Sequence, residues 1–249
     1  MTDRPTDEQP DAADVPSLAW IRSTALVEVA VASGQPTQLS LSVLLILAGL
    51  APLRADGNLS MAFVTTLLCA DTVVLVAFVA WRLHASGESV RGLLLGPGPW
   101  RHDIWLGLIC VPLIFGAVTV LIALVRLAWP ALHNVDINPF ESLIQSTRDA
   151  IVLGVLVVVS GGIKEEVQRA FVLRRFDQHL GGARLGLAVY SVVFGAGHVI
   201  QGYDVAIMTM LMGVAWGLLF LRRRNIVAAS LSHAGFNAAQ IVQFVVFGA

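Results

Sequence analysis

Long apolar runs, separated by short polar segments, follow one another along the chain from about residue 39 onward. Several of these runs approach the ~20 residues that an α-helix needs to cross the hydrocarbon core of a bilayer. We therefore predict an all-α protein, a polytopic transmembrane helical bundle with about seven spans. The predicted spans cover residues 39–53, 61–81, 104–129, 149–171, 185–200, 205–221 and 226–247.

The segments that precede these spans have a different composition. Residues 1–14 are acidic and rich in proline, unlike the basic start of a signal peptide, and this composition is typical of a disordered tail. Residues 17–33 mix apolar and charged positions, which predicts a helix at the membrane surface or a partly buried one. We therefore divide the chain into a tail (1–16), a surface helix with three spans (17–148) and a C-terminal unit (149–249).

Composition agrees with a membrane protein, so the lipid bilayer is the first expected partner. The chain is 56% hydrophobic and 13% charged, with a mean hydropathy of +0.76, whereas ordinary soluble domains are about 25% charged. A net charge of −1 gives no indication of a nucleic-acid partner. Cys69 and Cys110 lie inside apolar runs, and we interpret them as core residues rather than as a disulfide.

Arginine residues gather in alternate loops of the predicted bundle. Arg82, Arg91 and Arg101 lie between the second and third spans, and further arginines lie between the fourth and fifth and between the sixth and seventh. The positive-inside rule places these loops in the cytoplasm. With seven spans the N-terminus is also cytoplasmic, and we expect an integral protein of the cytoplasmic (inner) membrane.

Two adjacent glutamates, Glu165 and Glu166, continue the apolar run 150–159, together with Lys164 and Arg169. An ionised residue at mid-membrane costs roughly 2.5–3.5 kcal/mol, so the pair needs a partner, a water-filled cavity or both. Arg169 is four residues after the first glutamate and three after the second, and either spacing permits an ion pair on a helix. One glutamate would then remain for chemistry. The alternative is a helix end at which these charges leave the membrane.

The predicted span 185–200 carries His198, and the predicted span 226–247 carries His233 and Asn237. Alone, a histidine in an apolar helix is usually hydrogen-bonded structure, and the i,i+4 pair His233 and Asn237 is typical of hydrogen bonding between helices. With the glutamates, however, three of the last four predicted spans carry the residue types that activate a water and stabilise an oxyanion. The same types form divalent-metal sites of one carboxylate and two imidazoles with an open position.

Asp71 lies midway along the second predicted span. We expect a structural role, in which Thr65, Thr66 or Thr72 donates hydrogen bonds to it or the carboxyl group stays protonated. A transporter, with Asp71, the glutamates and the histidines along an ion pathway, is a further alternative. It is disfavoured because the polar residues gather on three late spans and the chain has no matching pair of broken helices.

These motifs resemble those of the CPBP family of intramembrane proteases, which includes the CAAX prenyl endopeptidases and bacteriocin-processing proteins. The family pattern is a Glu-Glu pair followed by Arg, then Phe-x-x-x-His, then His-x-x-x-Asn, on successive transmembrane helices. The resemblance covers roughly residues 149–247. The corresponding residues are Glu165 and Glu166 with Arg169, Phe194 with His198, and His233 with Asn237.

The resemblance implies an intramembrane endopeptidase that cleaves a peptide, a lipidated tail or a membrane protein near the cytoplasmic face. It implies that Glu165, with His198, deprotonates the attacking water, and that His233 and Asn237 stabilise the oxyanion or hold a metal. A zinc ion on Glu165, His198 and His233 is one form of this chemistry, and a glutamate-activated water without a metal is the other. Residues 149–249 would then be the catalytic helices.

One spacing departs from the family pattern, which usually has three residues between the glutamate pair and the arginine. Only two residues separate them in this chain. If the glutamates keep their family roles, Glu165 is the base and Glu166 pairs with Arg169. If the arginine sets the register, Lys164 takes the position of the base and the site is dead or altered. We prefer the first register, and the second would suit a non-catalytic membrane scaffold or regulator.

Overall fold

The computed structural model describes residues 17–247, so the predicted tail at 1–16 lies outside the described residues. Within that range there is no β-strand, only an isolated bridge between Leu53 and Leu59, and the predicted all-α class is confirmed. The α-helices are α1 (Leu18–Ala32), α2 (Gln35–Leu47), α3 (Met61–Ala85), α4 (Val90–Leu95), α5 (Arg101–Ala128), α6 (Thr147–Val157), α7 (Glu165–His179), α8 (Ala183–Ala196), α9 (Tyr203–Arg223) and α10 (Val227–Phe247).

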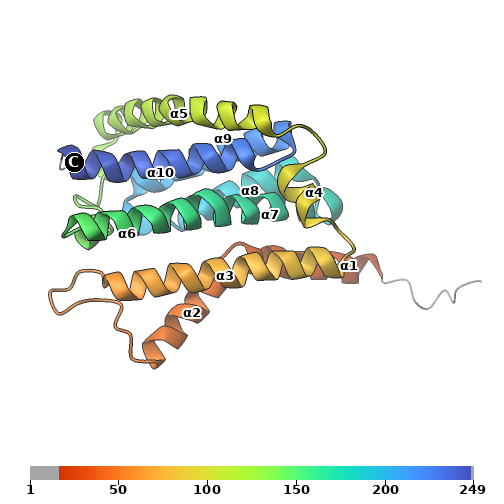
Figure 1. Ribbon diagram of the computed structural model, residues 1–249, viewed down its shortest axis with the longest axis horizontal. Helices are drawn as coiled ribbons and strands as arrows, with labels where there is room; N and C mark the ends of the chain where they lie inside the picture. Colours follow the sequence, from red (N-terminus) through yellow and green to blue (C-terminus); the bar gives the residue numbers. More distant parts are fainter. Residues whose placement is uncertain (1–16, 248–249) are drawn as a thin grey trace, which may run out of the picture.

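A π-helix, Val158–Lys164, joins α6 directly to α7, so these three elements form one continuous helical rod (Figure 1). Ser146 begins the rod, because its side chain accepts a hydrogen bond from the backbone N–H of Asp149 and so caps α6. The rod places the glutamate pair at the start of α7. The remaining short elements are 3₁₀ helices at Pro130–Leu132, Glu141–Leu143 and Val199–Gln201.

Three helices, α3, α5 and α9, are long and apolar enough to cross a membrane. A fourth span is added if α1 and α2, which are bent by 52° relative to each other, count as one. The predicted number of about seven spans is therefore not confirmed. Helix α8 has only 14 residues, fewer than the ~20 of a full span. Helix α10 has 21 residues, but serine, histidine, asparagine and glutamine interrupt its apolar sequence.

The helices form two parts, which Figure 1 separates clearly. Helices α1, α2 and α3, hereafter the N-terminal layer, lie on one side of the α6–α7 rod, and α10 and α5 lie on the other. Helix α10 packs against α5 and the π-helix, α8 packs against α9, and α7 packs against α8 and α1. The π-helix is consequently enclosed between the N-terminal layer and α10.

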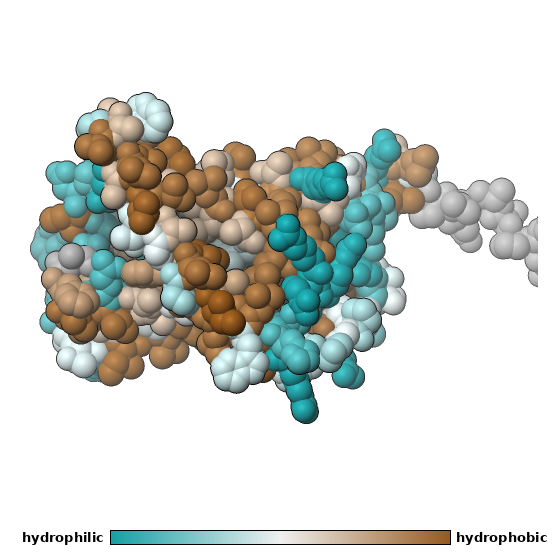
Figure 2. All heavy atoms as spheres, turned by 90° about the horizontal axis from the view of Figure 1, so that it is seen from above, coloured by the Kyte–Doolittle hydropathy of each residue, from teal (hydrophilic) through white to brown (hydrophobic). Residues whose placement is uncertain are grey.

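The core is centred on α7, and the outer surface is apolar as well. Phe171 of α7 and Leu83 of α3 are fully buried in one cluster, while Trp216 and Phe236 join α9 to α10 in a second. Figure 2 shows hydrophobic residues over much of the visible face, with a band of hydrophilic residues towards one end. Large apolar side chains such as Leu127 of α5 are exposed. Such a surface fits contact with lipid rather than water.

An ion-pair network closes one end of the bundle. Glu28 of α1 accepts hydrogen bonds from Arg82 of α3 and Arg175 of α7. Glu88, which follows α3, accepts from Arg174 and Arg175. The network therefore ties the C-terminal half of α7 to the N-terminal layer through charged groups that share their partners.

Candidate active site

Two glycines of the π-helix bring the rod into direct contact with α10. A Cβ atom added at Gly162 would lie 2.4 Å from Cβ of Ala234, and one added at Gly161 would lie 2.3 Å from Nδ2 of Asn237. Only glycine permits so close an approach. Asn237 donates from Nδ2 to the carbonyl oxygen of Val157 over 3.1 Å, next to the point where the helical pattern changes. Single π-turns inside α-helices often occur at functional sites.

His233 of α10 lies between the two glutamates. Its Nδ1 is 2.9 Å from Oε1 of Glu166, and its Nε2 is 3.7 Å from Oε2 of Glu165. Since a carboxylate only accepts hydrogen bonds, Nδ1 donates to Glu166, and Nε2 faces Glu165. The side chain of Glu166 is fully buried, whereas that of Glu165 is 20% exposed. Glu165 is therefore the more accessible carboxylate of the two.

Arg169 neutralises the buried carboxylate. Its guanidinium group donates to Glu166 across an i,i+3 spacing and is itself fully buried. The guanidinium carbon lies 5.6 Å from the ring centroid of Tyr190, 5.0 Å from that of Phe194 and 5.7 Å from that of Trp216. Aromatic faces at such distances attract a cation. The short spacing between the glutamates and the arginine thus still permits the ion pair.

Trp216 stacks on the ring of His233 and is itself hydrogen-bonded to Ser232, and both residues were missed by sequence reasoning. The Trp216 ring stacks on the imidazole with a centroid distance of 3.7 Å and an interplanar angle of 15°. Its Nε1 donates to Oγ of Ser232 over 3.1 Å. Phe194 adds an edge contact to the imidazole at 6.1 Å. No motif marks Trp216 in the sequence, because its place beside the imidazole depends on how α9 packs on α10.

His198 lies just after α8, next to this cluster rather than in it. Its Nδ1 donates to the carbonyl oxygen of Phe194 over 2.9 Å, which leaves Nε2 unprotonated in the neutral ring. Both imidazoles contact the Phe194 ring, since its centroid is 5.1 Å from that of His198. Among the described residues, His198 makes no ion pair with Glu165 or Glu166, whereas His233 lies within ion-pair distance of both.

The expected zinc ligands are Glu165, His198 and His233. Both imidazoles donate Nδ1–H to an oxygen and leave Nε2 open, as metal-bound histidines usually do. Residues 17–247 nevertheless contain no group of three histidine, cysteine or acidic side chains that could hold an ion. In this arrangement the residues do not fit a resident zinc ion. A metal there stays a prediction, and we derive no step through one.

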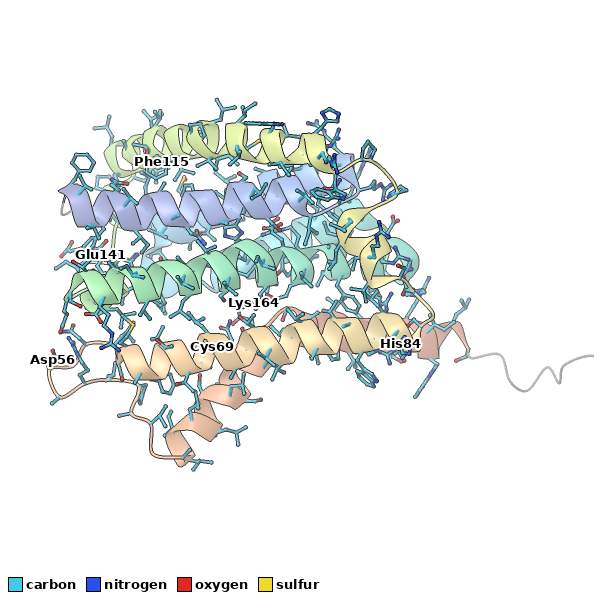
Figure 3. All side chains as sticks on the ribbon, viewed as in Figure 1. Asp56, Cys69, His84, Phe115, Glu141 and Lys164 are labelled. Atoms are coloured by element: carbon cyan, nitrogen blue, oxygen red, sulfur yellow. The ribbon has the colours of Figure 1, made fainter. Side chains whose placement is uncertain are left out.

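Asp71 does not have the threonine partners expected from the sequence. Its Oδ2 is 2.8 Å from Nζ of Lys164, and both side chains are at most 1% exposed. Gln38 donates to the same oxygen over 3.1 Å, while Thr66 and Thr72 donate to carbonyl groups of their own helix. The lysine prevails because an opposite charge compensates a buried carboxylate better than a hydroxyl group does. Figure 3 places Lys164 on the rod beside α3, away from α10.

Comparison with known proteins agrees with this geometry. Residues 147–239 match the family model described as type II CAAX prenyl endopeptidase Rce1-like. No curated protein and no solved structure matches the chain. The matched segment runs from α6 into α10, contains the glutamates and the histidines, and leaves the helices from α1 to α5 outside it. Residues 147–239, hereafter the Rce1-like domain, are therefore similar to the type II CAAX prenyl endopeptidases, and this match supports the resemblance to the CPBP family of intramembrane proteases.

Proposed function

We propose that this chain is an intramembrane endopeptidase that hydrolyses a peptide bond in a membrane-associated or lipidated substrate, using a water that Glu165 activates. The observation that carries the proposal is the position of His233 between a buried, neutralised carboxylate and a partly exposed one. The Rce1-like match supports protease activity in general. The substrate class, the base and the absence of a metal in the reaction scheme are our own proposals.

Glu165 acts as general base in the proposed reaction. The 3.7 Å between its Oε2 and Nε2 of His233 suits a bridging water better than a direct hydrogen bond. Glu165 takes a proton from this water, and the oxygen attacks the scissile carbonyl carbon to form a tetrahedral oxyanion. When the intermediate collapses, the C–N bond breaks and the protonated Glu165 gives its proton to the leaving amine. Water is consumed and no other reactant is required.

The remaining motif residues support this chemistry in distinct ways. Glu166 and Arg169 form a neutral pair that orients the imidazole through Nδ1. Asn237 uses one amide N–H on Val157 and has a second that can donate to an oxyanion. His198 presents an open Nε2 that can accept a proton from water or bind the substrate.

A non-catalytic scaffold or regulator is the alternative, and it rests on the short spacing between the glutamates and the arginine. Two observations count against it. Arg169 reaches Glu166 in spite of that spacing, and Lys164, which would replace the base in the alternative register, pairs with Asp71 instead. The protease proposal therefore keeps both carboxylates in their expected roles.

The proposal is tested by cleavage in proteoliposomes. Wild type is compared with Glu165→Ala, Glu166→Ala, His198→Ala and His233→Ala, and Glu141→Ala in the loop before α6 is a matched control. One probe is a fluorogenic peptide with a farnesylated C-terminal CAAX sequence, and the other is an unlipidated transmembrane peptide. We expect loss of cleavage in the four site variants and wild-type rates in the control. Equal turnover in all these proteins would refute the protease proposal.

A further inference from the structure

Buried hydrogen bonds tie the Rce1-like domain to helices that lie outside the family match. Lys164 of the π-helix pairs with Asp71 of α3, and Gln38 of α2 donates to the same carboxylate oxygen. Four residues further on, Gln168 donates from Nε2 to the carbonyl oxygen of Ala32, the last residue of α1, over 2.7 Å. The rod is therefore bonded to α3 through the Asp71 side chain and to α1 through the Ala32 carbonyl group, while α2 supports the same Asp71 carboxylate through Gln38.

These contacts lie on one face of the rod, and the candidate site lies on another. Lys164 and Gln168 are separated by four residues, so they share a face, and Glu165 and Arg169 share the next face, about 100° around the helix. Lys164 is the last residue of the π-helix, and α7 begins at the next residue, Glu165. While Lys164 is held towards α3, Glu165 is held towards His233 on α10.

Burial of the Lys164–Asp71 ion pair argues against a role limited to holding α3 and the rod together. The side chain of Lys164 is 1% exposed and that of Asp71 is 0% exposed. Oδ1 of Asp71 has no hydrogen-bond partner among the described residues. Apolar residues of similar size usually hold two elements together as well as a buried ion pair does. What they lack is the directional contact that fixes the rotation of a helix.

We propose that the Lys164–Asp71 pair is a positioning device for Glu165, so the N-terminal layer is part of the catalytic unit. This inference rests on the proposed function. Neither residue of the pair contacts substrate; both act through the position of the Glu165 carboxylate. A displacement of about 1 Å at a reacting group can lower a rate by about 100-fold, so a small rotation of α7 is sufficient for a large effect.

The test uses the full-length protein in nanodiscs. It distinguishes an ion pair that positions Glu165 from one that only holds α3 and the rod together. Asp71→Leu and Lys164→Met each leave an unpaired buried charge and are expected to lower the melting temperature. The double variant Asp71→Leu/Lys164→Met removes both charges and is expected to recover the melting temperature of wild type. For the same double variant, with the farnesylated peptide as probe, we expect kcat to stay at least about tenfold below wild type, with KM nearly unchanged. A double variant with wild-type kcat would overturn the inference.

A second measurement needs no substrate. Cys69 and Cys110 are both free, so both are replaced by alanine, and Glu165→Cys introduces one thiol at the candidate site. This thiol is titrated with a charged, water-soluble thiol reagent, with and without the double substitution. We expect the double substitution to change the modification rate several-fold, and an unchanged rate would overturn the inference even if no substrate is cleaved. The proposed function fails separately, if Glu165→Gln cleaves as fast as wild type.

Discussion

At the scale of single residues, Gly161 and Gly162 determine how closely α10 approaches the glutamate pair. The nearest atoms to a Cβ added at Gly162 are Cβ, Cα and N of Ala234, at 2.4, 2.8 and 3.0 Å. Two of these atoms belong to the backbone, so a side-chain rotation cannot relieve the clash. The site can form only while no side chain separates the rod from α10.

Gly162→Ala is therefore expected to destabilise the protein by about 1–3 kcal/mol, the usual cost of overpacking. The matched control is Gly116→Ala on α5, where an added Cβ would meet nothing within 4 Å. That substitution should leave stability unchanged or raise it by up to ~1 kcal/mol, because alanine has the higher helix propensity. Thermal unfolding in detergent measures both variants. Equal melting temperatures for the two would contradict the close contact between the rod and α10.

Contacts between residues close in sequence could be predicted, and contacts between distant residues could not. The Arg169–Glu166 pair follows from its i,i+3 spacing and is present. The threonine partners predicted for Asp71 were wrong, because its actual partner Lys164 is 93 positions away and no spacing rule connects them. The Trp216–His233 stack escaped prediction for the same reason.

At the scale of elements, apolar runs located the long helices well. The predicted spans 61–81, 104–129 and 205–221 correspond to α3, α5 and α9. The π-helix could not be predicted, because an apolar run has the same appearance whether its hydrogen bonds follow an α or a π pattern. The shortness of α8 was also missed, since its apolar sequence continues past Gly197, where the helix stops. The number of spans was therefore the least predictable feature of the fold.

Asn237 is expected to stabilise the junction between α6 and the π-helix. In Asn237→Ala the carbonyl group of Val157 loses its side-chain donor, and we expect a loss of about 1 kcal/mol in the free energy of unfolding. Gln240→Ala is the matched control on the same helix, because Gln240 is exposed, and its effect should stay within about 0.5 kcal/mol. A stable but inactive Asn237→Ala protein would assign this residue to catalysis alone.

At the scale of the whole molecule, the ion-pair network holds the N-terminal layer against α7 at one end of the bundle. Burial by itself would raise the pKa of Glu88, but hydrogen bonds from Arg175, Gln178 and Arg174 outweigh it and hold this pKa below its ordinary value. The pKa of Glu88 is lower in the folded state than in the unfolded state, so the ionised carboxylate stabilises the fold. This stabilisation is complete at pH values above the pKa of Glu88 in the unfolded state. This contribution is lost as the pH falls through the folded pKa.

At pH values below the ordinary glutamate pKa of 4.5, further acidification should therefore lower the melting temperature. Glu88→Gln should make this decline less steep. Glu141 provides a control of opposite sign, because burial raises its pKa and protonation favours the folded state. Glu141→Gln removes that favourable protonation and should make the decline steeper. The check is the melting temperature from neutral pH to about pH 3. Identical pH profiles for wild type and Glu88→Gln would contradict the role of the network.

The central claim is that Glu165 is the base that activates water, and a single comparison of rates tests it most directly. The measurement is kcat/KM for the farnesylated peptide in proteoliposomes, for wild type, Glu165→Gln and the control Glu141→Gln. Loss of a general base typically lowers the rate by about 10²–10⁴-fold, so Glu165→Gln should fall at least about 100-fold below wild type while the control remains close to it. A Glu165→Gln protein that cleaves as fast as wild type would contradict the account.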